Sequence, residues 1–300
     1  METRVRPYNR QEDYQRVGDF LVETFVKGPR HHNWRQPRWE YMHFHPMLDE
    51  SSLRRIGVWE NAGRIVAVAH YETAVGEAFF EVRHGFEHLR QEMLEYAQSH
   101  LCHHTGDGGG ALQAMINDFD HDFEAIAASQ GFLKDRAAAQ WVSEYVVPER
   151  FPAIELPGGF RLQSLADEND LSKVNRVLWK GFNHPGEPPP DGVEGRRKMQ
   201  SAPNFRQDLT VVVRAPNGEY ASFCGMWFDP VHRVCDVEPV ATDPEYRRLG
   251  LGKAVVLEGI RRCAELGATV AYVGSGQQFY AALGFKRIFA AYPWVKHFFA

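Results

Sequence analysis

One stretch in the second half of the chain decides the fold of that half, and it reads Val240-Ala241-Thr242-Asp243-Pro244-Glu245-Tyr246-Arg247-Arg248-Leu249-Gly250-Leu251-Gly252-Lys253. Residues 234–240, which lead into this stretch and include its first residue, have the composition of a strand. Those after it carry apolar side chains between Val256 and Ala264 at the spacing of one buried helix face, and Gly267 ends that pattern. We therefore predict a strand, a turn at Asp243-Pro244-Glu245, and a helix that opens at Arg247.

The junction between this strand and this helix has the chemistry of an anion site. A helix N-terminus offers unpaired N–H groups and a partial positive charge. Gly250 and Gly252 carry no side chain that would hold a pyrophosphate away, and Arg247, Arg248 and Lys253 add positive charge. Two glycines alone would also fit an ordinary turn before a surface helix. The phosphate loop of ATPases is excluded because Arg247 replaces its first glycine, and the dinucleotide fingerprint lacks its third glycine.

The same residues resemble the acyl-CoA motif of the GNAT superfamily, the acetyl-CoA-dependent N-acetyltransferases. The family pattern is (Gln/Arg)-x-x-Gly-x-(Gly/Ala) after a strand and a proline turn, and every fixed position is met by residues 247–252. Further on, residues 279–285 resemble the later signature of the family, a tyrosine shortly before Leu-Gly-Phe. The chain departs from the family at Val273, where an asparagine is frequent. The resemblance covers residues 160–300 well and residues 1–150 weakly.

This resemblance implies a set of roles. Splayed central strands would hold the pantetheine through backbone groups, the helix N-terminus would bind the pyrophosphate, and Tyr280 would protonate the leaving thiolate. The implied cofactor-binding residues are Val240, Ala241, Thr242, Arg247, Arg248, Leu249, Gly250, Leu251, Gly252 and Lys253.

Acyl transfer to an amine also needs a base, because the attacking nitrogen must be neutral. Several family members draw a carboxylate from the strand before the later helix, but residues 269–273 contain none. Glu238 is therefore our candidate, acting directly or through water, with Asp236 behind it. Strand periodicity places both on the face of Val240. The alternatives are a solvated or ion-paired role for Glu238 and a packing role for Tyr280.

The first half of the chain repeats the pattern of the second. An apolar helical stripe recurs 157 positions later, as Val17, Phe20, Leu21 and Phe25 against Val174, Val177, Leu178 and Phe182. A hairpin follows each stripe, and each copy closes on a Gly-Phe pair. Because prolines and glycines punctuate residues 148–159, we predict two tandem GNAT-like domains, 1–150 and 151–300. Each is expected to be an α/β domain with a mixed, mostly antiparallel sheet flanked by helices.

The first copy has lost the residues that carry the chemistry. When Val82 is aligned with Val240, Glu92 and Leu94 fall on the two glycines. Aligning the Gly-Phe pairs places Ala127 at the position of Tyr280. We therefore expect residues 1–150 to be a degenerate, non-catalytic copy that shapes the active cleft or stabilises the protein.

Composition narrows the classes of partner. The 300 residues carry a net charge of -5, which gives no support for a nucleic-acid partner. No 18-residue apolar run or export leader points to a membrane. The four scattered cysteines suit reduced thiols in the cytoplasm, and the histidine groups have no paired spacing typical of a metal site. The sequence does not indicate an oligomeric state.

These observations predict an N-acyltransferase that moves an acetyl group from acetyl-CoA to a primary amine of a small molecule. The alternatives are an acetyltransferase for protein N-termini or lysines, and a non-catalytic acyl-CoA sensor. Tyr280 and Glu238 favour an enzyme, because a sensor needs the cofactor cradle but no acid–base pair. An extra domain with its loops favours a small amine over a peptide, which must enter an open groove.

Overall fold

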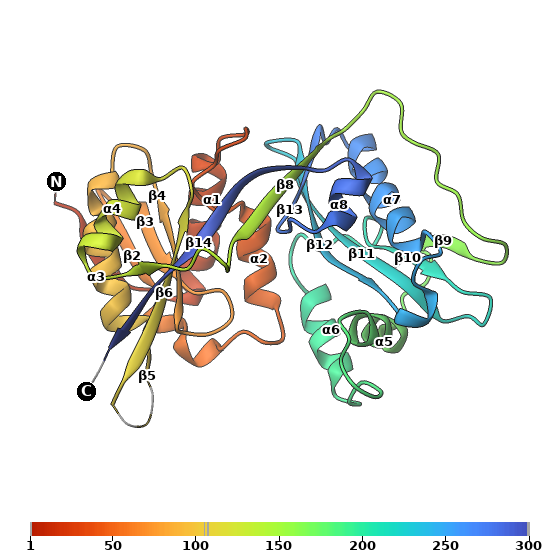
Figure 1. Ribbon diagram of the computed structural model, residues 1–300, viewed down its shortest axis with the longest axis horizontal. Coiled ribbons are helices and arrows are strands. Elements are labelled where there is room, and N and C mark those ends of the chain that lie inside the picture. Colours follow the sequence, from red (N-terminus) through yellow and green to blue (C-terminus); the bar gives the residue numbers. More distant parts are fainter. Residues whose placement is uncertain (1, 105, 107, 299–300) are drawn as a thin grey trace. The chain divides into compact units, whose positions relative to one another are not determined.

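A computed structural model describes residues 2–104, 106 and 108–298. It divides into two compact units (Figure 1), with Met1–His43, Met47–Val142 and Arg287–Ala300 in unit 1 and Phe44–Pro46 and Ser143–Lys286 in unit 2. This division differs from the predicted domains 1–150 and 151–300 in two main ways: residues 143–150 lie in unit 2, and the C-terminal segment lies in unit 1. Residues from Arg287 onward belong to unit 1, because the last strand pairs there. Strand pairing over so long a sequence separation leaves no local signal.

Unit 1 is a mixed sheet in which the β4–β6 pair is parallel and the other pairs of the main sheet are antiparallel. Its order is β1 (Arg4–Pro7), β2 (Gly57–Asn61), β3 (Arg64–His70), β4 (Glu77–Val82), β6 (Gly110–Asn117), β14 (Lys286–Phe298). Two short strands join its edges, β5 (His103–His104) on β6 and β7 (Leu133–Lys134) on β14.

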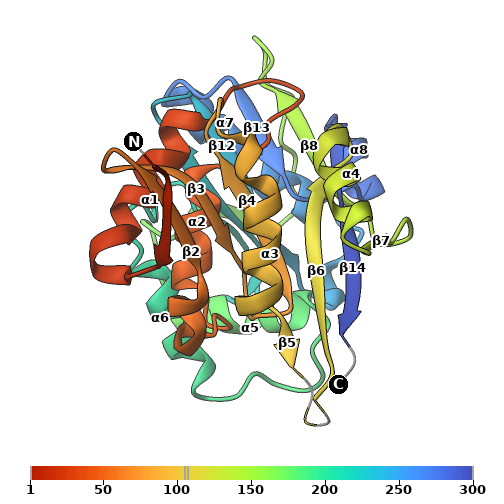
Figure 2. The ribbon, with the colours of Figure 1, turned by 90° about the vertical axis from the view of Figure 1, so that its left-hand side faces the viewer.

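Helices cover this sheet and bury its core. They are α1 (Arg10–Thr24), α2 (Gln36–Phe44), α3 (Arg90–His100) and α4 (His121–Ser129), with 3-10 turns η1 (Glu50–Arg55) and η2 (Glu87–Leu89). α3 packs across β2, β3 and β4 (Figure 2), and the buried side chains of all four helices join one apolar cluster with the strands.

Unit 2 has the same kind of sheet, with β12 and β13 parallel and the other pairs antiparallel. Its order is β8 (Gln140–Val146), β13 (Val270–Val273), β12 (Val234–Thr242), β11 (Tyr220–Asp229), β10 (Val211–Arg214), β9 (Arg161–Ser164). Its helices are α5 (Leu171–Gly181), α6 (Gly192–Gln200), α7 (Leu251–Glu265) and α8 (Gln278–Leu283), with the 3-10 turn η3 (Pro244–Tyr246).

The two faces of this sheet are covered by different helices. Along β10, Val211 and Val213 join the core under α7, whereas Val212 joins the core under α5. Such alternation is what a strand of period two produces between two helical layers. The predicted fold class, a mixed and mostly antiparallel sheet flanked by helices, is thereby confirmed for both units.

The predicted strand, turn and helix are also present, but the helix begins later than expected. α7 starts at Leu251 rather than at Arg247, with Gly250 as its N-cap. Arg248 and Gly250 have φ of 66° and 79°. Residues in this left-handed region cannot belong to a right-handed helix, so the segment before Leu251 is a loop.

The described residues contain no helix that is both long and apolar enough to span a bilayer. Over the same ranges, no three or more His, Cys, Asp or Glu side chains gather where they could hold a metal ion.

Candidate active site

The sheet of unit 2 opens beside β12. β12 pairs with β13 over Val234–Asp236, opposite Val270–Tyr272, and then continues to Thr242. On its other side β12 remains paired with β11 as far as Thr242. Residues 240–242 of β12 therefore lie beyond the segment that pairs with β13. Their backbone edge on that side faces the gap where β12 and β13 diverge. An extended ligand could pair with this edge as an additional strand does.

The helix that follows presents its N-terminus without a side-chain cap. Gly250 is the N-cap of α7 and makes no capping hydrogen bond through a side chain. The first-turn N–H groups of such a helix are available to an anion. The two glycines serve different needs. Gly250 adopts a positive φ, whereas a Cβ on Gly252 would lie 3.1 Å from Thr242 Oγ1 and 3.4 Å from the Phe279 ring.

Arg247, the first fixed residue of the motif, braces this loop from within unit 2. Its guanidinium donates to the carbonyls of Thr242 (3.2 Å) and Gly181 (2.9 Å) and to Asn183 Oδ1 (2.8 Å). All three acceptors are neutral, so these bonds hold the loop against the end of α5 without cancelling the charge of Arg247. By contrast, Arg248 and Lys253 extend into solvent.

Tyr280 lies on α8 with only 8% of its surface exposed. Its ring packs edge-on against Phe279 and Phe285, with centroids 5.0 and 5.5 Å away. Burial raises the pKa of its phenol, and the nearby Cys224 and Glu238 raise this pKa further. Tyr280 is therefore protonated at neutral pH, the state that a proton donor needs.

Glu238 lies in a bulge of β12. Val240 is opposite Cys224 and Val237 is opposite Met226, so Glu238 and Pro239 together face the single residue Gly225. An added Cβ at Gly225 would clash with the Glu238 carbonyl oxygen, which explains the glycine.

This bulge corrects the expectation that Asp236 and Val240 share a face. Val240 packs with Cys235 and Val237 in the core under α7, whereas Asp236 is paired with Trp227 on the opposite side of the sheet. An extra residue in one strand reverses the alternation beyond it. No periodicity argument could place this bulge. Glu238 is brought within electrostatic range of Tyr280.

Unit 1 has a matching gap between its parallel strands, but its own chain fills it. β4 and β6 pair at Glu77 and Ala78 and then diverge. Beyond this point, Asn33 Oδ1 accepts from Val82 N (2.9 Å) and Asn33 Nδ2 donates to Val82 O (3.0 Å). The Asn33 carboxamide thus occupies both backbone groups of the residue equivalent to Val240. Nothing in the sequence pattern had indicated this role for Asn33.

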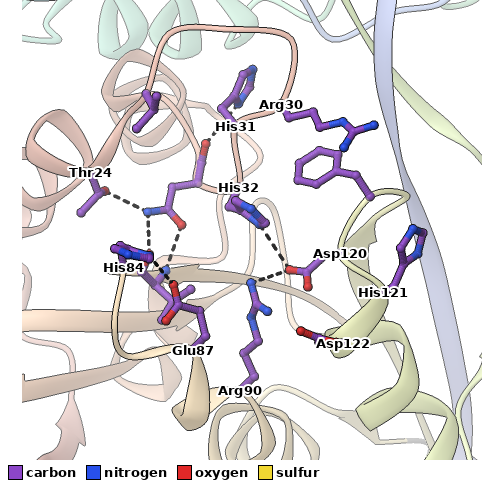
Figure 3. A pocket seen from close by; sticks show the side chains of 14 residues that line it. Thr24, Arg30, His31, His32, His84, Glu87, Arg90, Asp120, His121 and Asp122 are labelled. Atoms are coloured by element: carbon purple, nitrogen blue, oxygen red, sulfur yellow. Dashed lines mark hydrogen bonds and ion pairs between the residues drawn. The ribbon is translucent and has the colours of Figure 1, made fainter.

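A cavity of about 520 Å³ lies beside the Asn33 carboxamide, and two side chains contact Asp120 within it (Figure 3). The Asp120 carboxylate forms an ion pair with Arg90 Nη2 at 2.6 Å, and the same oxygen lies 3.3 Å from His32 Nδ1. Arg90 is the first residue of α3, so the Arg90–Asp120 ion pair lies at the helix N-terminus of unit 1. The equivalent position in unit 2 is the uncapped N-terminus of α7.

The expected obstruction in unit 1 is therefore corrected. Leu94 is a core residue and Glu92 accepts a hydrogen bond from Trp59 Nε1 at 2.9 Å, so neither lies at the start of α3. Ala127 does lie at the position of Tyr280, because Phe132 N donates to the Ala127 carbonyl as Phe285 N donates to the Tyr280 carbonyl. The fixed offset from Val82 fails because residues 83–89 separate Val82 from α3, whereas the longer segment 241–250 separates Val240 from α7. Matching the two helix starts places Leu89 opposite Gly250.

Comparisons with known proteins agree with this geometry. Residues 172–285 match the acetyltransferase (GNAT) family. A mycothiol acetyltransferase of a Nocardioides species is 29% identical over 198 residues, which are 59% of this chain and 66% of the relative. The matched segment is thus just short of two thirds of that protein.

Two solved structures share the fold over nearly the whole chain. A tandem GNAT protein from the clavulanic acid biosynthesis pathway has a TM-score of 0.66 at 16% identity, covering 99% of this chain and 98% of its own. An N-acetyltransferase of Sphaerobacter thermophilus has a TM-score of 0.63 at 15% identity, covering 98% and 95%. The open strand edge and the glycine-capped helix both lie within residues 172–285, and this segment is an acetyltransferase domain of the GNAT family.

Proposed function

We propose that this chain transfers the acetyl group of acetyl-CoA to a primary amine of a small molecule, at the gap beside β12. The observation that carries the proposal is that the cofactor cradle adjoins a buried phenol. Gly252, in the first turn of α7, lies against the ring of Phe279, and Tyr280 follows in the chain. A site that only bound acyl-CoA would need the cradle and not the phenol.

Each residue group has a separate task. The edge of residues 240–242 would pair with the pantetheine, and the α7 N-terminus, with Arg248 and Lys253, would hold the pyrophosphate. Acetyl-CoA supplies an activated acyl group on a thiolate that can leave. Glu238 would accept the proton of the attacking amine, directly or through water, while Tyr280 donates its proton to the departing sulfur.

The small size of the proposed acceptor amine is supported by a relative of this chain and not by the geometry of the site. The Nocardioides relative is named for mycothiol, a small molecule. That relative is matched over only part of its length, so its acceptor suggests the class of substrate and not the substrate itself.

The proposal is tested with a panel of small amines, amino sugars and short peptides incubated with acetyl-CoA, while release of free CoA thiol is followed. Thiol release that depends on a small amine, with an N-acetylated product found by mass spectrometry, is the expected result. Release with peptides alone, or with no member of a broad panel, would contradict it.

Glu238→Gln is expected to lower kcat about 100-fold at pH values where the acceptor amine is protonated. Raising the pH should restore part of the rate, because solvent then removes the proton that Glu238 removes in the parent. Glu265→Gln, at the far end of α7 in an ion pair with Arg261, is the control and should behave as wild type. A loss that is equal at every pH would show that Glu238 is not the base.

Isothermal titration is expected to find one CoA per chain. The reason is that Asn33 occupies the strand edge of unit 1 and the Arg90–Asp120 pair stands at the start of α3. Two sites of similar affinity would refute the view that unit 1 is a degenerate copy.

A further inference from the structure

The backbone of Glu238 is held by a neighbouring indole. Trp227, on β11, donates from Nε1 to the Glu238 carbonyl oxygen at 3.0 Å. We propose that Trp227 is a positioning residue, which fixes the bulge of β12 so that the Glu238 carboxylate meets the acceptor amine. The inference rests on the proposed role of Glu238 as the base.

The bulge needs such a support because the regular ladder is interrupted there. Glu238 and Pro239 face one residue of β11, so backbone pairing cannot hold both in place. Pro239 has no N–H to donate. Gly225 leaves room for the Glu238 carbonyl to approach β11, and the indole N–H of Trp227 then holds that carbonyl.

The indole can perform this task because its own orientation is set by packing. Trp227 is 3% exposed and makes an edge-to-face contact with Phe205, with ring centroids 6.0 Å apart. Phe205 in turn packs against the core under α5. The N–H direction is thereby imposed by packing on the face of the sheet opposite to α7.

The expected consequence is catalytic rather than structural. Without the indole N–H, the Glu238 carbonyl loses the hydrogen bond from Trp227, and the bulge is held less firmly. A displacement of about 1 Å is enough to remove most of the benefit of a positioned base. The cofactor cradle is built from residues 240–253 and not from Trp227, so binding of CoA should be retained.

The test is a double-mutant cycle of Trp227→Phe and Glu238→Gln. Trp227→Phe keeps an aromatic ring against Phe205 and removes only the donor. It should lower kcat about 10-fold with the KM for acetyl-CoA within about twofold, and the loss should shrink as the pH rises, as for Glu238→Gln. The double variant should be no slower than Glu238→Gln alone, because a mispositioned base costs nothing once the base is gone.

Trp179→Phe is the matched control. Trp179 also lies in unit 2 and donates from Nε1 to a backbone carbonyl, that of Pro185, at 3.2 Å. This variant removes the same kind of bond and should leave kcat and its pH dependence unchanged. Retention of the CoA-induced rise in Tm verifies that each variant is folded.

The outcomes separate the inference from the proposed function. Full activity in Trp227→Phe, or losses that multiply in the double variant, would overturn the positioning role while Glu238 remained the base. Full activity in Glu238→Gln would instead remove the base, and the inference with it. Should Trp227→Phe not fold, Phe205→Leu carries the same cycle, because it removes the edge-to-face contact that orients the Trp227 indole.

Discussion

Tyr280→Phe is expected to lower kcat about 100-fold while leaving the Kd for CoA nearly unchanged. The phenol proton is needed only as the thiolate departs, so its loss raises the barrier without weakening the ground state. The ring itself remains, and with it the contacts to Phe279 and Phe285. Because burial raises the pKa of Tyr280, the parent enzyme should show no alkaline loss of activity from this group up to about pH 10.

Steady-state kinetics with a good amine substrate, together with calorimetric titration of CoA, measure this effect. Tyr145→Phe is a matched control, since Tyr145 is also 8% exposed and contacts the same Phe285 at 5.3 Å. The control should keep its full rate. A Tyr280→Phe variant as fast as wild type would mean that the thiolate leaves without this acid.

Gly250→Glu should abolish CoA binding. The substitution places a carboxylate and its bulk at the N-cap of α7, where the pyrophosphate is expected. At a φ of 79°, any side chain also adds about 1 kcal/mol of backbone strain. The strain must be separated from the charge, and Gly250→Asn does this because asparagine tolerates the left-handed region and is neutral.

Thermal unfolding with and without CoA is the measurement. Wild type and Gly250→Asn should both gain Tm when CoA is added, and Gly250→Glu should gain none. A Gly250→Glu variant that is folded and still shows the wild-type gain would remove the pyrophosphate from this helix end.

The relation between sequence and structure differs along the motif. The strand, turn and helix of residues 234–265 could be predicted from local pattern, because each element is specified by its own side chains and by two glycines. The late start of α7 could not, since the positive φ of Arg248 arises from the loop as a whole. The brace from Arg247 to Gly181 and Asn183 is likewise a contact between segments far apart in the chain.

The internal repeat also predicted the structure only where the pattern is local. The apolar stripes of α1 and α5 identified two copies of one fold, because a buried helix face must recur with the helical period wherever it occurs. Transfer of a constant offset beyond these helices misplaced Glu92 and Leu94, since loops change length without changing the sheet. The closure of the unit 1 gap by Asn33 depends on a loop that meets β4 only in the folded chain.

The sequence by itself determined the fold class, the tandem copies and the family, because these depend on periodicity and on a motif that is contiguous in the chain. Only the tertiary structure decided that the last strand completes unit 1, that a bulge separates the faces of Asp236 and Val240, and that Trp227 holds Glu238. The physical reason is the same in each case. Strand pairing, bulges and side-chain bonds to a distant backbone are set by neighbours in space, and a local pattern carries no record of them.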